Sequence, residues 1–180
     1  MRLNALAINT GVLILVLSLC GCDAVYRLLH KEGAEEKEIL GEIVPYEANE
    51  GVVEVQKLLK LYGYKIGKVD GILGANTRNA IATFQEDNGI KVSRFVDQAT
   101  WARLNAFEQY GLIEAGELNI LTVQQALTAA GVDPGPVDGK LGRKTKAAIN
   151  KFQEQQGLVP DGKIGLKTLL HLSQYLDSDS

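Results

Sequence analysis

Cysteine and histidine are scarce in this chain of 180 residues, which contains two of each. Both cysteines, Cys20 and Cys22, lie near the N-terminus, so the rest of the chain has neither a disulfide framework nor a cysteine metal site. The two histidines, His30 and His171, stand far apart and lack the ligand spacing of a zinc site. We therefore expect a body that folds by apolar packing alone, without a metal or a cofactor.

The chain also lacks alternating strands of useful length and an apolar run that would span a membrane comfortably. Its net charge of −3 argues against a nucleic-acid partner. The charge is uneven, however, because residues 31–50 contain seven Glu and two Lys, whereas the segments on the C-terminal side have more Lys and Arg than Asp and Glu. This pattern predicts an acidic tether that holds mildly basic modules.

The N-terminal segment is typical of an export signal, with Arg2 followed by an apolar core at residues 11–19. Its end, Leu19-Cys20-Gly21-Cys22, resembles the bacterial lipobox. That resemblance implies that residues 1–21 are removed and that Cys22 carries a lipid which anchors the protein to a membrane. An uncleaved anchor or a signal without lipid is the alternative. We expect residues 22–50 to form the lipidated Cys and an acidic tether, either a short exposed helix or a fluctuating linker.

A segment of some fifty residues occurs twice without a gap, as residues 55–104 and 123–172. The loop at residues 67–77 matches the loop at residues 135–145, so that Asp70 corresponds to Asp138, 138 − 70 = 68 positions later. Glycines, apolar residues and a Thr recur at the same offsets, which indicates a duplicated domain. We assign repeat 1 to residues 51–107, a linker to residues 108–117 and repeat 2 to residues 118–176.

Each repeat has three segments in which apolar residues follow helical spacing. The first segment of repeat 1 covers residues 55–62 and ends at Gly63, where a left-handed residue is tolerated. In repeat 2, Thr122 and Gln125 resemble a capping box at the first helix. The predicted fold class is therefore all-α, with two tandem small three-helix bundles after an N-terminal signal and an acidic linker.

Four motifs run through repeat 2. They are Val-Gln-x-x-Leu from residue 123, Gly-x-Val-Asp-Gly-x-Leu-Gly-x-x-Thr from 135, Ala-Ile-x-x-Phe-Gln from 148, and Asp-Gly-x-x-Gly-x-x-Thr-x-x-x-Leu from 161. Together they resemble the bacterial peptidoglycan-binding domain, a three-helix module found on wall hydrolases and wall lipoproteins. In repeat 1 the resemblance holds as far as Gly89. Beyond it, Ser93-Arg94 replace the Asp-Gly pair and Asp97 replaces the next Gly. Because Arg143, Lys144 and Lys146 add positive charge at the start of the middle helix, where repeat 1 has Ala75 and Asn76, we expect repeat 2 to be the stronger binder.

The candidate binding residues lie in the loop and at the start of the middle helix of each repeat. A helix start can receive a carboxylate, and the resemblance implies stem peptides or amino sugars as ligands. The ligand-binding candidates are Tyr64, Asp70, Gly71, Gly74, Gln85, Asp138, Gly139, Gly142, Arg143, Lys144 and Gln153. We expect the two Gln at the edge of a helix face, within reach of a sugar. The alternative is that the Asp-Gly pairs are turns, the glycines are caps and the Gln side chains face solvent.

No residues remain for a catalytic domain once the signal, the tether and two bundles are assigned. Wall amidases need clustered zinc ligands, cysteine crosslinkers need a Cys in the body, and lysozymes need a carboxylate in a larger domain. We therefore predict a non-catalytic, lipid-anchored protein of the bacterial cell envelope that binds peptidoglycan, tying membrane to wall or recruiting a partner. The alternative is an adaptor that keeps the fold and binds an envelope protein.

Overall fold

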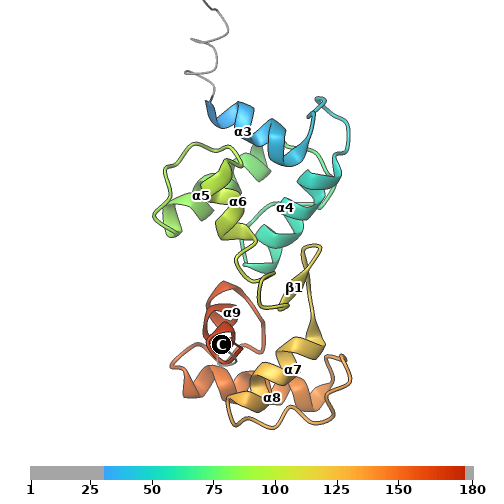
Figure 1. Ribbon diagram of the computed structural model, residues 1–180, viewed down its shortest axis with the longest axis vertical. Helices are drawn as coiled ribbons and strands as arrows, with labels where there is room; N and C mark the ends of the chain where they lie inside the picture. The colour runs from blue at the N-terminus through green and yellow to red at the C-terminus, as the bar shows by residue number, and fades with distance from the viewer. Residues whose placement is uncertain (1–30, 177–180) are drawn as a thin grey trace, which may run out of the picture.

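A computed structural model of the protein describes residues 31–176. The expected signal, Cys22 and residues 23–30 of the expected tether lie outside this range. The described helices and strands are α3 (Lys31–Leu40), α4 (Glu50–Leu61), α5 (Ala75–Asp87), α6 (Gln98–Leu104), β1 (Ile113–Glu114), β2 (Glu117–Leu118), α7 (Ile120–Ala129), α8 (Arg143–Gln155) and α9 (Leu166–Ser173). The prediction of an all-α fold with tandem helical bundles is confirmed (Figure 1).

Repeat 1 is a bundle of α4, α5 and α6 around a core that includes Leu58, Ile81, Phe84 and Leu104, which are all fully buried. Helix α4 packs against both other helices. Its N-cap is Asn49, whose side chain accepts a hydrogen bond from the Val52 N–H. The apolar spacing of the sequence thus becomes the buried faces of three short helices.

Repeat 2 is built in the same way from α7, α8 and α9, with Leu127, Ile149, Phe152 and Leu172 fully buried. One sequence expectation is wrong here. The N-cap of α7 is Asn119, which accepts from the Thr122 N–H, and not Thr122 itself. The capping box therefore does not form, because the helix already begins at Ile120.

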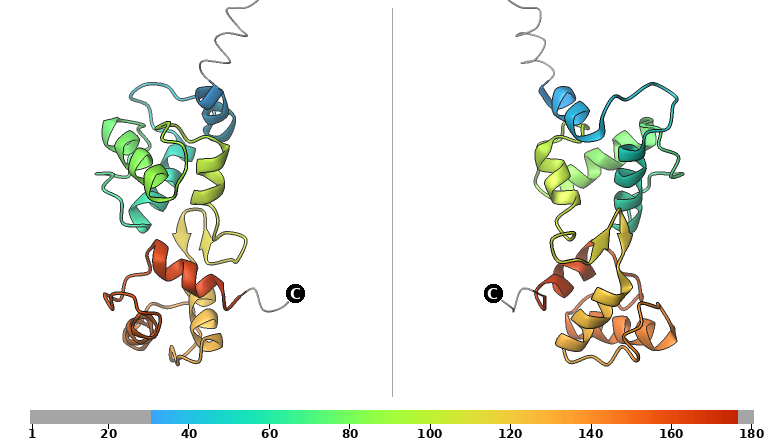
Figure 2. Two further views of the ribbon diagram at one scale, coloured as in Figure 1. Left: turned by 90° about the vertical axis from the view of Figure 1, so that its left-hand side faces the viewer. Right: turned by 45° about the vertical axis from the view of Figure 1, so that its right-hand side comes forward.

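The two repeats are joined by a small antiparallel hairpin in which Ile113 pairs with Leu118. The hairpin lies between the bundles, as both views of Figure 2 show, and its second strand packs against α4. The Lys57 ammonium lies 2.8 Å from the Glu117 carboxylate across this contact. The linker thus takes part in the packing between the repeats.

Helix α3 packs against α4 and α6 of repeat 1. Leu40 and Glu36 are 6% and 3% exposed, so the expectation of an exposed acidic helix or a fluctuating linker is wrong for these residues. Asn49 fixes the end of α3, since its amide donates to the Leu40 carbonyl oxygen at 2.9 Å. Its own N–H donates to the Gly71 carbonyl oxygen at 3.0 Å, which links α3 to the loop before α5.

Candidate functional site

A buried glutamine organises the loop of repeat 2. The Gln124 side-chain carbonyl accepts from the N–H groups of Asp138 and Gly139 at 3.0 and 2.8 Å. Its amide faces four acceptors, the carbonyl oxygens of Pro136 and Lys140, Asp138 Oδ1 and Thr145 Oγ1, at 2.9 to 3.3 Å. One side chain on α7 therefore holds the whole loop that leads into α8.

The same arrangement occurs four times, with Gln56 and Gln85 in repeat 1 and Gln124 and Gln153 in repeat 2. Each Gln amide donates to a Thr in the first or second turn of the next helix, 21 residues later for Gln56 and Gln124 and 15 residues later for Gln85 and Gln153. We call these glutamines the hubs. The recurring Gln-to-Thr spacing was visible in the sequence and marks them.

The structure contradicts the expectation for Gln85 and Gln153. We expected both at the edge of a helix face, within reach of a sugar, but they are 0% and 2% exposed. Their amides are used inside the protein, since Gln153 bonds Asp161 Oδ1, the Lys163 carbonyl oxygen and Thr168 Oγ1 at 2.9 to 3.1 Å. A buried amide needs such partners, and these two hold loops instead of facing solvent.

The aspartates of the loops are exposed, but one carboxylate oxygen of each is bonded within its own loop. Asp70 Oδ1 accepts from the Gln56 amide and from the Ile72 N–H, both at 3.0 Å. These bonds, the Gln56 amide first, hold the pKa of Asp70 below its ordinary value. The pKa of Asp138 is lowered in the same way, first by the Lys140 N–H and then by the Gln124 amide. Both Asp-Gly pairs therefore form turns that are stabilised by the Asp carboxylate.

Gly71 and Gly139 each have a positive φ, 73° and 74°, which a residue with a side chain adopts only at a cost. Their surroundings differ. A Cβ on Gly71 would lie 2.9 Å from the Asn49 nitrogen, whereas the nearest atom to a Cβ on Gly139 would be Leu121 Cβ at 3.9 Å. Gly71 is therefore also required for the close approach of two backbone segments.

Gly74 and Gly142 are the N-caps of α5 and α8, with extended backbones and no side chain to cap the helix. Both are exposed, so the first N–H groups of each middle helix are left without a side-chain cap. Arg143 and Lys144 are exposed at the start of α8, as expected. The structure therefore brings the Asp-Gly turn, the Gly cap and two cations together in repeat 2.

Repeat 1 has a hollow of about 410 Å³ beside the start of α5. The residues that line it are Gln56, Ile66, Gly67, Lys68, Asp70, Ile72, Gly74, Ala75, Asn76 and Thr77. Sequence reasoning missed Lys68, which is exposed on this loop. Ala75 and Asn76 are small at the positions that Arg143 and Lys144 occupy in repeat 2. The hollow thus combines a cation with an uncapped helix start.

The corresponding place in repeat 2 is partly filled. The stem of Lys144 lies over Gly135, so that a Cβ on this glycine would be 2.9 Å from Lys144 Cδ. The hollow of about 300 Å³ in this repeat lies instead along α8 and is lined by Asp133, Lys144, Ala147, Ala148 and Lys151. The two repeats thus share one framework and present different surfaces.

Tyr64 does not lie in either hollow. Its ring packs edge-on against Phe84, with centroids 5.6 Å apart, and its hydroxyl donates to Asp87 Oδ2 at 3.1 Å. Burial raises the pKa of this hydroxyl to about 12. The structure therefore separates Tyr64 from the other candidates of its repeat.

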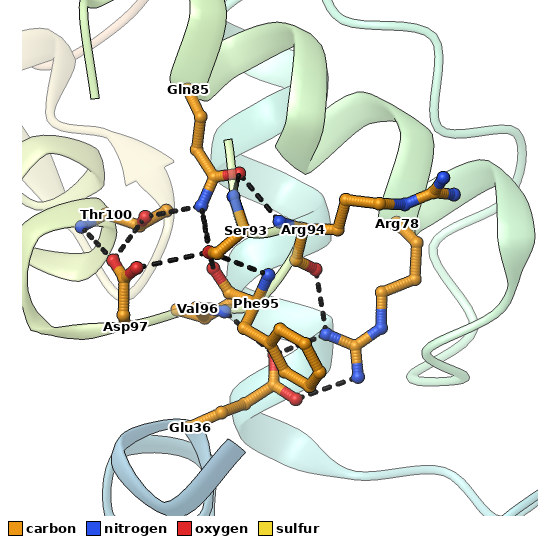
Figure 3. Close-up of polar contacts among 9 residues, drawn as sticks. All are labelled: Glu36, Arg78, Gln85, Ser93, Arg94, Phe95, Val96, Asp97 and Thr100. Atoms are coloured by element: carbon orange, nitrogen blue, oxygen red, sulfur yellow. Dashed lines mark hydrogen bonds and ion pairs between the residues drawn. The ribbon is translucent and has the colours of Figure 1, made fainter. Parts of the chain in front are cut away.

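The second loop of repeat 1, residues 88–97, makes the same kind of bonds as the corresponding loop of repeat 2 although its motif differs. Ser93 Oγ receives a bond from the Gln85 amide at 2.9 Å, where Asp161 serves in repeat 2, and Arg94 adopts a φ of 68° in place of a glycine. Asp97 caps α6 by accepting from the Thr100 N–H (Figure 3). The fold of this loop thus does not require the Asp-Gly pair.

Within residues 31–176, no three His, Cys, Asp or Glu side chains group together in a way that could hold a metal ion. In the same range, every helix is too short or too polar to cross a membrane.

Comparison with known proteins identifies the repeats. The family model described as "Putative peptidoglycan binding domain" matches residues 48–104 and again residues 117–172. A stretch of 111 residues is 32% identical to N-acetylmuramoyl-L-alanine amidase CwlM of Mycobacterium tuberculosis (strain ATCC 25618 / H37Rv). This match covers 56% of the present chain and 27% of the amidase, so the chain spans about a quarter of that relative. No solved structure gives a significant match. The chain therefore belongs to the peptidoglycan-binding domain family and contains two copies of that domain in tandem.

Proposed function

We propose that this protein binds peptidoglycan through its two repeats and does not cleave it. The observation that carries the proposal is the double family match, since each match covers a three-helix bundle with intact hubs. The similarity to a wall amidase supports a place at the cell wall. Because the chain spans about a quarter of that enzyme, we assign wall binding to this protein and not amidase activity.

In repeat 1 the ligand lies in the hollow beside α5. Lys68 and residues 74–76 at the start of α5 line the same space, and a cation and a helix start both favour a negative group. A stem-peptide carboxylate at this point would be met by a full positive charge and by the helix dipole. The hollow is partly open to solvent, which suits the end of a flexible peptide.

In repeat 2 the cations stand at the helix start itself. Arg143 and Lys144 take the places of Ala75 and Asn76, and both are exposed. They attract the same carboxylates, Arg143 through its planar guanidinium and Lys144 through its ammonium charge. Two sites on one chain raise the avidity for a polymeric wall, because the second binding event becomes intramolecular.

We further propose that the protein ties a membrane to the wall through a lipid on Cys22, in the bacterial envelope. The start of α3 and the α7–α8 pair lie at opposite ends of the longest axis of the described structure (Figure 1). A chain anchored ahead of α3 would thus hold repeat 2 away from the membrane. This arrangement supports a bridging role.

Cosedimentation of the full chain, in mild detergent, with purified insoluble sacculi tests the proposal. We expect retention of the wild type. Lys68→Glu is expected to lower retention severalfold, whereas Lys65→Glu, an exposed cation on the same loop outside the hollow, serves as the matched control. The double change Arg143→Ala and Lys144→Ala tests repeat 2 in the same assay.

Three outcomes contradict parts of the proposal. If the wild type is not retained on sacculi, wall binding is refuted and the alternative adaptor that binds an envelope protein is favoured. If the purified protein releases muropeptides from sacculi, the non-catalytic assignment is wrong. If a labelled fatty acid is incorporated equally with and without Cys22→Ala, the lipid is not attached at this residue.

A further inference from the structure

Helix α3 binds the second loop of repeat 1 through three glutamates on one face. Glu36 accepts from Arg78 Nη1 and Nη2 at 2.6 and 2.8 Å and from the Val96 N–H at 2.8 Å (Figure 3). Glu35 accepts from the Gln98 N–H at 3.1 Å, and Glu32 pairs with Lys91. The acidic helix therefore docks by its carboxylates.

The group around the Glu36 carboxylate has the form of a carboxylate-binding site. We call Arg78, Phe95 and the Val96 N–H the cradle. The guanidinium contacts both oxygens, which is the strongest geometry for binding a carboxylate. The guanidinium lies over the Phe95 ring, with Arg78 Cζ 4.7 Å from the ring centroid, and it also donates to the Arg94 carbonyl oxygen. Glu36 is only 3% exposed, so water competes little for these contacts.

The bundle itself does not need this cradle. Repeat 2 has Lys146, Lys163 and Ile164 at the positions of Arg78, Phe95 and Val96. It nevertheless forms three helices, and its hub Gln153 donates to Thr168 as Gln85 donates to Thr100. Among residues 31–176, Lys146 forms no ion pair. The Arg fork and the aromatic ring are thus specific to repeat 1, and they serve the binding of a carboxylate.

Helix α3 is suited to leave the cradle. It is followed at once by Gly41, whose φ of 78° ends the helix and allows the chain to turn there. Its contacts with the loop come from the carboxylates of Glu32, Glu35 and Glu36, and its apolar contact with the core is made by Leu40 at its C-terminal end. It also precedes residues 48–104, which the family model matches, so that the module is complete without it.

We propose that the cradle is a binding site for the terminal carboxylate of a short peptide, and that α3 closes it with Glu36 as an internal ligand. An external carboxylate displaces Glu36 by taking over its bonds to Arg78 and to the Val96 N–H. The identification of that peptide as a wall stem peptide rests on the proposed function. The carboxylate chemistry does not, because it follows from the cradle alone.

The test is a calorimetric titration of the full chain, in detergent micelles, with N-acetylalanine and with its uncharged amide. Glu36→Ala is expected to bind the acid about tenfold or more tightly than the wild type, because an internal carboxylate competes at a millimolar effective concentration. Neither protein is expected to bind the amide. Adding Arg78→Leu to Glu36→Ala removes this gain in affinity, whereas adding Lys146→Ala, the corresponding change in repeat 2, leaves the gain unchanged.

Equal affinity of the wild type and a folded Glu36→Ala variant for the acid would overturn the proposal, as would equal binding of acid and amide. If Glu36→Ala does not fold, hydrogen exchange in the wild type decides. Amides of α3 should exchange faster in N-acetylalanine than in its amide supplemented with salt to the same ionic strength, and equal rates refute displacement. No sacculi are used, so this result and the retention result can fail independently.

Discussion

Replacing a hub glutamine measures how much of each bundle depends on one side chain. Gln124→Met keeps the length of the side chain and removes its amide. The loop then loses about four hydrogen bonds. About two are donated by the amide, whose two N–H groups share four acceptors, and two are accepted by the side-chain carbonyl oxygen. At about 1 kcal/mol net for each bond, and with some groups regaining water, the expected loss is about 3 kcal/mol.

Thermal unfolding followed by far-ultraviolet circular dichroism checks this value. A loss of about 3 kcal/mol lowers the Tm of a bundle of this size by about 15 °C. The single Trp, Trp101, lies in repeat 1, so its fluorescence shows whether that bundle stays folded while repeat 2 melts. Gln125→Met is the matched control, because Gln125 is the next residue on α7 and is exposed. A loss below about 1 kcal/mol for Gln124→Met would refute the hub.

Three further tests use substitutions in other parts of the structure. Gly71→Ala should destabilise repeat 1 by more than about 2 kcal/mol and Gly139→Ala should destabilise repeat 2 by about 1 kcal/mol in urea unfolding, because only the first adds a backbone clash to the left-handed φ. Asn119→Ala should cost about 1 kcal/mol and Thr122→Ala much less, since Asn119 is the observed cap. Asp138 has a lowered pKa, so its contribution is present above the unfolded pKa and is lost as pH falls through the folded pKa. Asp138→Asn should therefore flatten the acid side of the stability–pH curve, and an unchanged curve would contradict this.

The sequence was sufficient to predict the bundles because helical spacing and duplication are local or periodic signals. Residues 55–62 carried one apolar face, and this face is buried in α4. The short hairpin was not predicted, because Ile113 and Leu118 form one pair of a ladder too short to leave an alternating pattern. Helix starts were less certain than helices, as the shift from Thr122 to Asn119 shows.

The docking of α3 could not be predicted from composition. A segment with seven Glu, such as residues 31–50, ordinarily indicates a solvated surface. Only the fold brings Arg78, which follows Glu36 by 42 residues in the sequence, next to the Glu36 carboxylate. The same reason explains the error at Gln85 and Gln153. A Gln after a buried Phe looks like an edge residue until the following loop folds back over its amide.

The hubs also explain why the family motif predicts the fold better than the ligand. Gln56, Asp70 and Thr77 all belong to the motif, and their polar atoms bond one another, so these residues are required for the loop whether or not a ligand binds. The groups that we propose to face a ligand stand at positions where the two repeats differ, Lys68 in repeat 1 and Lys144 in repeat 2. Ligand preference in a tandem pair can therefore diverge at these positions while both bundles keep the same internal bonds, and a single domain match cannot report it.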